Sequence, residues 1–308
     1  MLVLRALGLG DLLTGVPALR GLRRAFPDYE LVLAAPEQLR EVAAEIDAVD
    51  SLLPADAPDR GVPSLLHWSK PAPAVAVDLH GNGPESRLAL AELRPWRLLA
   101  STDPQLTADP PWRAEDHERV RWCRLLAAYR IAADPDDVRL PRPERSPAPG
   151  AVVVHPGANA PARRWPVERY AEVVRGLLAA LPGRPVVLSG GPGEEPLVRE
   201  LAGLLPPLPV YCGLPFREFA GLVGQASLLI GTDSGPAHLA VAYGTPSVTL
   251  FGPVAPEIWG PPPNGPHRVV YHPGPPGDAN GAVPDPCLLD IGADEVLKEA
   301  LKAAEGAR

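Results

Sequence analysis

The feature that most constrains this chain is a regular alternation of short apolar runs with longer helical segments. After residue 150, the apolar runs predict buried strands at 151–154, 186–189, 210–212, 228–231 and 247–251. Helical periodicity fills the intervals between them, at 167–181, 194–204, 216–224 and 236–243. Because each strand is followed by a helix that can cross back over a sheet, the pattern predicts βαβ units around a parallel sheet.

The region before residue 140 repeats this pattern, with strands predicted at 2–5, 31–35 and 74–78 and helices at 12–26, 37–46 and 114–129. Residues 141–150 hold four prolines and no apolar periodicity, which is typical of a semi-rigid linker. The predicted fold class is therefore α/β, with two Rossmann-like, doubly wound domains at 1–145 and 146–308 that face a cleft. A final helix at about 293–304 belongs to the second domain or packs back on the first.

Composition narrows the functional classes. The chain has 308 residues, enough for two hydrophobic cores, and its net charge of −8 disfavours a nucleic-acid partner, which needs a clustered basic surface. Three cysteines without a CxxC pair predict neither a disulfide framework nor a cysteine zinc site. The N-terminal residues do not resemble a signal peptide, and no apolar run approaches the ~20 residues of a membrane span. We expect a cytoplasmic protein, with peripheral contact at the inner membrane face and the oligomeric state left open.

The first glycine-containing turn follows the first strand and comprises Gly8, Gly10 and Asp11. Such a turn lets the backbone approach a ligand closely. The dinucleotide fingerprint needs a third glycine where this chain has Leu13, so a nicotinamide or flavin site is disfavoured. Two interpretations of Asp11 stay open: a residue that caps the following helix, or a carboxylate that faces the cleft and acts as a base.

Two loops of the second domain carry charged side chains directly after predicted strands. Residues 155–157, His-Pro-Gly, open the first loop, and Arg163 and Arg164 follow with guanidinium groups suited to phosphate. The second loop ends with Glu194 and Glu195, and acids at this position hold ribose hydroxyls in nucleotide-binding folds. The alternatives are a solvated basic loop and acids that only stabilise a helix N-terminus.

The most specific motif is GTDSGPAHLA at residues 231–240. A predicted strand ends there, and the helix that begins at Pro236 directs the backbone N–H groups of Ser234 and Gly235 toward a ready anion site. Asp233 orients a ligand or only caps the helix. His238 contacts the ligand or is an ordinary structural histidine.

Taken together, these blocks resemble glycosyltransferase family 9, the heptosyltransferase-like enzymes. The resemblance covers about residues 1–261 and is specific because four blocks match in order and spacing. The blocks are Gly10-Asp11-Leu-Leu with Pro17-Ala-Leu, His155-Pro-Gly-Ala with Arg164-Trp-Pro, Gly191-Pro-Gly-Glu194-Glu195, and Asp233-Ser-Gly-Pro-Ala-His238-Leu-Ala-Val-Ala with Phe251-Gly-Pro and Trp259-Gly-Pro.

The resemblance implies a GT-B fold and a division of labour between the two halves. The second half is expected to bind a nucleotide-activated sugar, typically ADP-heptose. The first half is expected to bind an acceptor, typically the sugar of a membrane glycolipid. The implied reaction inverts the anomeric centre and uses neither a metal nor another cofactor.

Carried over residue by residue, the resemblance assigns Asp11 as the catalytic base. Arg163 stands where the family has a phosphate-binding lysine, and the ribose-binding glutamate falls on Glu194 or Glu195. The resemblance also places Leu214 near the nucleobase and Asp233, Ser234 and Gly235 at the diphosphate. From the loops themselves, we add Gly157, Arg164 and His238 on the donor side and Gly10 and Arg87 on the acceptor side.

Three functions stay open at this point: the transferase, a nucleotide-sugar epimerase of the same architecture, and a non-catalytic nucleotide-binding protein. A glycosidase needs two carboxylates that flank one bond, and the sequence identifies no such pair. The motif Asp134-Pro-Asp136 is interpreted as a solvated turn and not as a metal site. Arg20, Arg23 and Arg24 either contact anionic lipid headgroups or form a solvated helix face.

Overall fold

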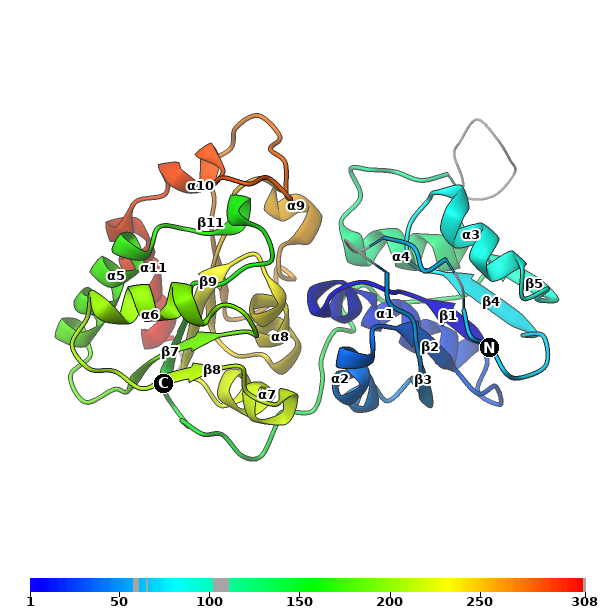
Figure 1. Cartoon of the computed structure of the whole chain (residues 1–308), viewed down its shortest axis with the longest axis horizontal. Helices are drawn as coiled ribbons and strands as arrows, with labels where there is room; N and C mark the ends of the chain where they lie inside the picture. The colour runs from blue at the N-terminus through cyan, green and yellow to red at the C-terminus, as the bar shows by residue number, and fades with distance from the viewer. Residues whose placement is uncertain (58–60, 65, 102–110, 307–308) are drawn as a thin grey trace. The chain divides into compact units, whose positions relative to one another are not determined.

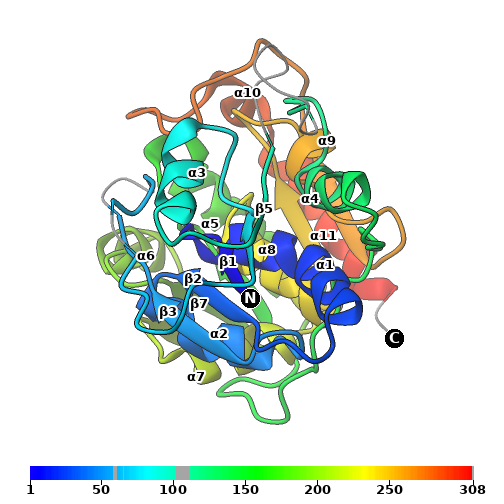
Figure 2. The ribbon, with the colours of Figure 1, turned by 90° about the vertical axis from the view of Figure 1, so that its right-hand side faces the viewer.

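The computed structural model describes residues 1–57, 61–64, 66–101 and 111–306 (Figures 1 and 2). The chain divides into two compact units, Met1–Val138 and Arg139–Arg308. The sequence places this boundary after residue 145, inside the proline-rich segment. In the structure that segment joins the second unit, because Leu140 N donates to Ala242 O at 2.9 Å and Gln225 Nε2 donates to Pro143 O at 2.5 Å.

Within the described residues, the first unit is built on a five-stranded sheet in the order β3-β2-β1-β4-β5, and all its strand pairs are parallel. The strands are β1 (Leu2–Leu4), β2 (Val32–Ala35), β3 (Ser51–Pro54), β4 (Val75–Asp78) and β5 (Arg97–Leu99). The helical elements are α1 (Leu9–Ala25), η1 (Glu37–Leu39), α2 (Arg40–Glu45), α3 (Pro84–Ala91) and α4 (Glu118–Ala128). Strands β1, β2 and β4 are buried throughout, as expected for the centre of a parallel sheet.

Three elements of this unit were not predicted, and each lacks the signal that marks the others. β3 and β5 are edge strands that are only partly buried, so neither needs a continuous apolar run. α3 begins at Pro84, inside residues 80–87, which the sequence assigns to a polar loop. Proline suits the first turn of a helix because its missing N–H needs no partner there.

The second unit is built on a six-stranded sheet of described residues in the order β11-β10-β9-β6-β7-β8, again with parallel pairs. Its strands are β6 (Val152–His155), β7 (Val186–Gly190), β8 (Val210–Cys212), β9 (Leu228–Thr232), β10 (Ser247–Leu250) and β11 (His267–Val270). Its helical elements are η3 (Pro161–Arg163), α5 (Val167–Ala180), α6 (Glu195–Gly203), α7 (Phe216–Gly224), α8 (Gly235–Tyr243), α9 (Pro256–Trp259), α10 (Pro286–Asp290) and α11 (Ala293–Glu305).

The core of the second unit lies where helices cover this sheet. α5, α6 and α11 lie on one face, and α7 and α8 lie on the other (Figure 1). The final helix, α11, packs within the second unit against α5 and strands β9, β10 and β11. β11 was not predicted, because it is another partly exposed edge strand.

The strand orders locate where ligands are expected. In each sheet the order reverses between two central strands, β1 and β4 in the first unit and β6 and β9 in the second. Doubly wound sheets bind ligands outside the carboxyl ends of the strands at such a reversal. A ligand of either unit is therefore expected at the loops that follow these four strands. Across the described residues, no helix is both long and apolar enough to span a membrane.

Candidate functional site

At the ends of β6 and β7, the side chains of Ser189, His155 and Glu194 form a row of polar contacts. His155 ends β6 and is only 3% exposed. Its Nδ1 lies 2.9 Å from Ser189 Oγ, and its Nε2 lies 3.2 Å from Glu194 Oε2. Gly191 N donates to the same carboxylate oxygen at 2.7 Å. These side chains meet because β6 and β7 are neighbours in the sheet.

Gly157 leaves the space that the Glu194 carboxylate occupies. A Cβ at position 157 would lie 2.0 Å from Glu194 Oε2, far inside contact distance. Burial raises the pKa of Glu194, but the hydrogen bond and charge of His155, the Gly191 amide and the charge of Arg164 outweigh it, so the pKa lies below its ordinary value. Glu194 is therefore an ionised hydrogen-bond acceptor at neutral pH. Arg164 itself donates from Nε to Ala158 O at 3.0 Å.

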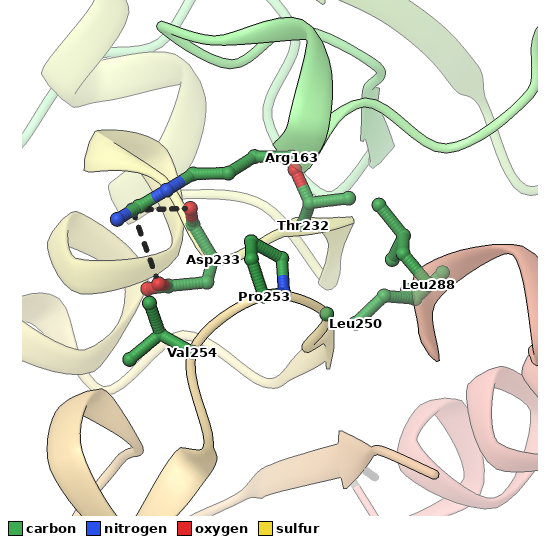
Figure 3. A pocket seen from close by; sticks show the side chains of 8 residues that line it. Arg163, Thr232, Asp233, Leu250, Pro253, Val254 and Leu288 are labelled. Carbon is green, nitrogen blue, oxygen red and sulfur yellow. Dashed lines mark hydrogen bonds and ion pairs between the residues drawn. The ribbon is translucent and has the colours of Figure 1, made fainter. Parts of the chain in front are cut away.

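A second cluster joins the loops that follow β6 and β9. Arg163 Nη1 lies 3.2 Å from Asp233 Oδ2, and His238 Nε2 lies 3.2 Å from the other carboxylate oxygen, Oδ1. Figure 3 shows the Arg163 side chain extended toward Asp233. His238 also packs edge-on against Trp259, with 5.8 Å between ring centroids. Asp233 is thus engaged with two cationic or titratable side chains and does not cap α8.

The N-terminus of α8 lies beside this cluster. Ser234 is the N-cap residue, and its Oγ donates to Thr232 O at 3.1 Å, while Gly235 is the first helical residue. A helix N-terminus carries partial positive charge and favours anions. Arg163, on the short helix η3, brings a guanidinium group next to it, and Asp233 balances part of that charge. The arrangement suits a phosphate group.

A small cavity of about 10 Å³ lies under the Arg163–Asp233 ion pair (Figure 3). This is roughly the space that one water molecule needs. Thr232 is 1% exposed, and among the described residues its Oγ1 has no hydrogen-bond partner. The cavity is lined by Arg163, Thr232, Asp233, Leu250, Gly252, Pro253, Val254 and Leu288. An unsatisfied hydroxyl therefore lies within reach of any polar group that enters it.

The structure separates the two candidate glutamates. Glu194 joins His155, whereas Glu195 is the first residue of α6 and lies beside Gly213, where a Cβ would stand 3.6 Å from Glu195 Oε1. Gly213 has a positive φ of 60° and turns the chain after β8 toward the half-buried Leu214. Glu194 contacts His155 and Gly191, which the sequence did not predict, and Glu195 lies beside the turn at Gly213 that precedes Leu214.

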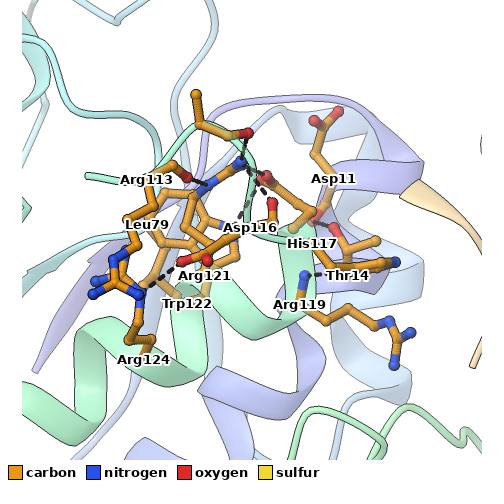
Figure 4. Close-up of polar contacts among 12 residues, drawn as sticks. Asp11, Thr14, Leu79, Arg113, Asp116, His117, Arg119, Arg121, Trp122 and Arg124 are labelled. Carbon is orange, nitrogen blue, oxygen red and sulfur yellow. Dashed lines mark hydrogen bonds and ion pairs between the residues drawn. The ribbon is translucent and has the colours of Figure 1, made fainter. Parts of the chain in front are cut away.

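In the first unit, Asp11 is the third residue of α1, and Gly8 is the N-cap. Gly8 N donates to Asp11 Oδ2 at 3.0 Å, which is the half of a capping box that the third helical residue supplies, since glycine has no side chain for the other half. The interpretation of Asp11 as the N-cap is therefore wrong in position, because Gly8 is the N-cap and Asp11 caps its N–H from the third position. Asp11 is 6% exposed, and Figure 4 shows its carboxylate directed away from Arg121 and Arg124. Gly10 precedes it in the first turn of α1.

Arg5 ties the loops after β1 and β4 together, and no sequence motif singled it out. Its side chain is fully buried. It donates to the carbonyl oxygens of Asp11 and Leu79, to Thr14 Oγ1 at 3.2 Å and to Glu118 Oε1 at 3.0 Å. Its guanidinium also lies 5.1 Å from the Trp122 ring centroid. The signal in the sequence is a single charge inside the apolar run of residues 2–7, which must find partners if the run is buried.

Asp78 ends β4 and organises the loop that leads to Arg87. It is 1% exposed, and it accepts hydrogen bonds from Ser86 Oγ at 2.6 Å and from His80 N at 2.9 Å. Burial raises the pKa of Asp78 to about 6, although these hydrogen bonds and the charge of Arg87 act in the opposite direction. Since β4 pairs with β1, this loop lies at the same sheet edge as Asp11.

We expect Asp78→Asn to remove a pH dependence of folding stability. Because the pKa of about 6 in the folded state exceeds the unfolded value of 3.8, the folded state binds this proton more tightly. The stabilisation is complete below about pH 3.8 and is lost as the pH rises through 6. A pKa difference of this size corresponds to about 3 kcal/mol. Urea unfolding between pH 4 and 7.5 should show the wild-type protein losing that much relative to the variant, and a constant difference would contradict the expectation.

Ion pairs bear on the hypotheses about the three arginines of α1 and about the Asp134-Pro-Asp136 motif. Arg20 pairs with Asp47 at 2.8 Å and with Asp137 at 2.7 Å. Arg24 also pairs with Asp137, and Arg23 pairs with Asp50. These pairs neutralise the three arginines of α1 and favour the solvated-face interpretation over a lipid-binding one. Asp136 pairs with Arg119 at 2.9 Å, and its N–H donates to Asp134 at 3.0 Å, as expected for a turn.

Comparison with known proteins identifies the second unit most clearly. Residues 128–271 match the family model described as glycosyltransferase family 9 (heptosyltransferase). Lipopolysaccharide heptosyltransferase 3 of Escherichia coli is 36% identical over 115 residues, which cover 36% of this chain and 33% of that protein. Lipopolysaccharide heptosyltransferase 2 of Escherichia coli K12 is 33% identical over 160 residues, or 47% of this chain and 44% of that protein. The matched segments span less than half of these curated relatives.

Solved structures extend the similarity in fold to nearly the whole chain. The Escherichia coli ADP-heptose lipopolysaccharide heptosyltransferase II has a TM-score of 0.76 at 20% identity and covers 99% of this chain and 98% of its own. The Escherichia coli heptosyltransferase WaaC with ADP has a TM-score of 0.71 at 19% identity, with 98% and 99% covered. The predicted GT-B class is confirmed. The resemblance to glycosyltransferase family 9 is confirmed by the match of residues 128–271 to the family model.

Proposed function

We propose that this protein is an inverting, metal-independent glycosyltransferase. It moves a heptose-like sugar from an ADP-linked donor to a hydroxyl of a glycan or glycolipid acceptor. The relatives are named lipopolysaccharide heptosyltransferases, and the structurally similar WaaC was solved with ADP. In this proposal the enzyme is cytoplasmic and meets a lipid-linked acceptor at the inner face of the membrane.

The observation that carries the proposal is that a carboxylate and a positively charged site follow neighbouring strands at one edge of the sheet. Glu194 offers an ionised carboxylate suited to hydroxyl groups, held by His155 and Gly191. Arg163 and the N-terminus of α8 offer positive charge suited to a diphosphate. β6, which lies between β7 and β9, places the two groups side by side. A ribonucleoside diphosphate needs both.

The proposed chemistry uses one base and one anion site. The acceptor oxygen forms a bond to the anomeric carbon from the face opposite the leaving group, so the configuration inverts. Asp11 takes the proton of the acceptor hydroxyl. The bond between the anomeric carbon and the phosphate oxygen breaks, and its electron pair leaves with the nucleoside diphosphate. Arg163, His238 and the α8 N-terminus stabilise the charge that develops there.

Nucleotide-dependent thermal stability tests the donor half of the proposal. The melting temperature is measured with ADP, UDP, GDP and dTDP, each with and without EDTA. A ligand at ~100 times its dissociation constant adds about 2.7 kcal/mol, which shifts the transition clearly. We expect a selective shift with ADP that EDTA leaves unchanged. A shift that EDTA abolishes would overturn metal independence, and no shift with any nucleotide would overturn the donor assignment.

Product analysis then separates the transferase from the two alternatives. ADP-heptose is incubated alone and with a panel of glycan acceptors, and the products are resolved by chromatography and mass spectrometry. The proposal predicts ADP release and acceptor gain of one sugar mass only when an acceptor is present. An epimerase would convert the donor alone, and a binding protein would leave the sugar–phosphate bond intact with every acceptor.

A further inference from the structure

We infer that His155 is the positioning residue that orients Glu194 to read the hydroxyls of the donor ribose, so that it sets selectivity for ribonucleotides over deoxyribonucleotides. The inference rests on the proposed function, because it assumes that the second unit binds a nucleoside diphosphate. His155 itself does not touch the ribose in this account. It acts through the carboxylate that it holds.

Each ring nitrogen of His155 has a polar contact, Nδ1 with Ser189 and Nε2 with Glu194. An ionised carboxylate only accepts, so Nε2 carries the proton that bridges to Glu194 Oε2 at 3.2 Å. Nδ1 lies 2.9 Å from the Ser189 hydroxyl oxygen, so the other ring nitrogen is also hydrogen-bonded. Ser189 is fully buried and the His155 side chain is 4% exposed, so water does not compete for these contacts. The two contacts together hold the ring in one orientation.

One carboxylate oxygen of Glu194 accepts hydrogen bonds from the protein, and the other is left for a ligand. Oε2 accepts from both His155 and Gly191 N. Among the described residues, Oε1 has no hydrogen-bond donor, and the side chain is 14% exposed, so a ligand can reach it. Gly157 closes the other side, because its backbone lies against the carboxylate. The carboxylate therefore has little freedom to turn.

A carboxylate in a fixed position distinguishes ribose from deoxyribose by the number of hydroxyl groups that can donate a hydrogen bond to it. A ribose hydroxyl donates a charge-assisted hydrogen bond to Oε1, and a hydrogen bond to a charged group contributes enough for a roughly 10- to 100-fold change in affinity. A deoxyribose lacks that donor and leaves a partly desolvated charge unsatisfied. If the carboxylate turned freely, water or another ligand group would satisfy it, and the difference between the two sugars would shrink.

The test compares ADP with 2′-deoxy-ADP and 3′-deoxy-ADP by titration calorimetry on the full chain. The readout is the ratio of deoxy to ribo dissociation constants, which a merely structural role does not change. We expect a ratio of about 10 or more for at least one deoxy nucleotide with the wild-type protein. Glu194→Gln should reduce that ratio toward one, and His155→Phe should do the same although Glu194 is intact.

His238→Phe is the matched control, because it removes a histidine from the phosphate cluster of the same unit. It should weaken all three nucleotides equally and leave the ratio unchanged. Ser189→Ala, a smaller change that frees only Nδ1, should lower the ratio partly, and it carries the test if His155→Phe does not fold. An unchanged ratio in folded His155→Phe or in Ser189→Ala overturns the inference. Absence of ADP binding by the wild-type protein overturns the proposed function itself, which is a different result.

Discussion

Asp11→Asn is expected to lower the rate of sugar transfer by about 10²- to 10⁴-fold, the contribution that a positioned general base makes. The reason is that an amide does not take the proton of the acceptor hydroxyl. The same substitution keeps the helix cap, because the amide oxygen of asparagine accepts from Gly8 N as the carboxylate oxygen does at 3.0 Å. Transfer is measured as ADP release with a productive acceptor, and donor binding is measured by calorimetry.

The variant separates the two roles of Asp11 only if folding and donor binding survive. We expect the donor dissociation constant to stay within about threefold and the free energy of unfolding to fall by less than about 1 kcal/mol. Asp11→Ala is the matched comparison, since it removes the cap and the base together and should lose both stability and turnover. Retained turnover in Asp11→Asn would exclude Asp11 as the base and leave the cap as its role.

The architecture was predictable where burial imposes a continuous apolar run. The central strands β1, β2, β4, β6, β7, β9 and β10 were all found, since both faces of each are covered and the sequence must be apolar throughout. The edge strands β3, β5 and β11 are partly exposed and mix polar with apolar residues, so local pattern does not distinguish them from loops. They are defined by pairing with a neighbour, which is a tertiary property. The fourth described edge strand, β8, was predicted because its residues Val210–Cys212 form a short apolar run.

The candidate site was predictable as a set of loops but not as a set of contacts. Strand ends and glycines placed Gly157, Arg163, Glu194 and Asp233 at one sheet edge. The sequence did not show that Asp233 bridges Arg163 and His238, or that His155 holds Glu194. These contacts join residues far apart along the chain, and their distances depend on side-chain orientation. The different surroundings of Glu194 and Glu195 therefore became evident only in the structure.

The buried polar network of the first unit was not predictable from the sequence, for a related reason. Asp78 looks like the last residue of a strand, and Glu118 like the first residue of a helix. Their burial becomes evident only when the sheet and α4 are assembled around them. Arg5 is the clearest case, because its partners come from three separate segments of the chain: α1, the loop after β4 and α4. A buried charge predicts that partners exist, but the sequence alone does not name them.

Arg5→Met is expected to destabilise the protein by about 3–5 kcal/mol, the cost of breaking a buried ion pair from one side. Methionine fills much of the same space but donates no hydrogen bond. The carbonyl oxygens of Asp11 and Leu79 lose a donor, and the partners that remain to the buried Glu118 in the described part of the chain are Arg121 and Trp122. Urea unfolding followed by tryptophan fluorescence measures the loss, because Trp122 lies beside Arg5.

A double-mutant cycle with Glu118→Gln shows whether the loss comes from the ion pair. Glutamine keeps an acceptor for Trp122 Nε1, which donates to Glu118 Oε1 at 2.9 Å. The double variant should be more stable than the sum of the two single losses predicts, because it leaves no unpaired carboxylate beside the methionine. Arg40→Met is the matched control: its pair with Glu37 is about half exposed and should contribute little to stability, because water screens it. A similar small loss for Arg5→Met would mean that the buried network does not hold the Asp11 loop to the sheet, and that the capping box alone sets the position of the proposed base.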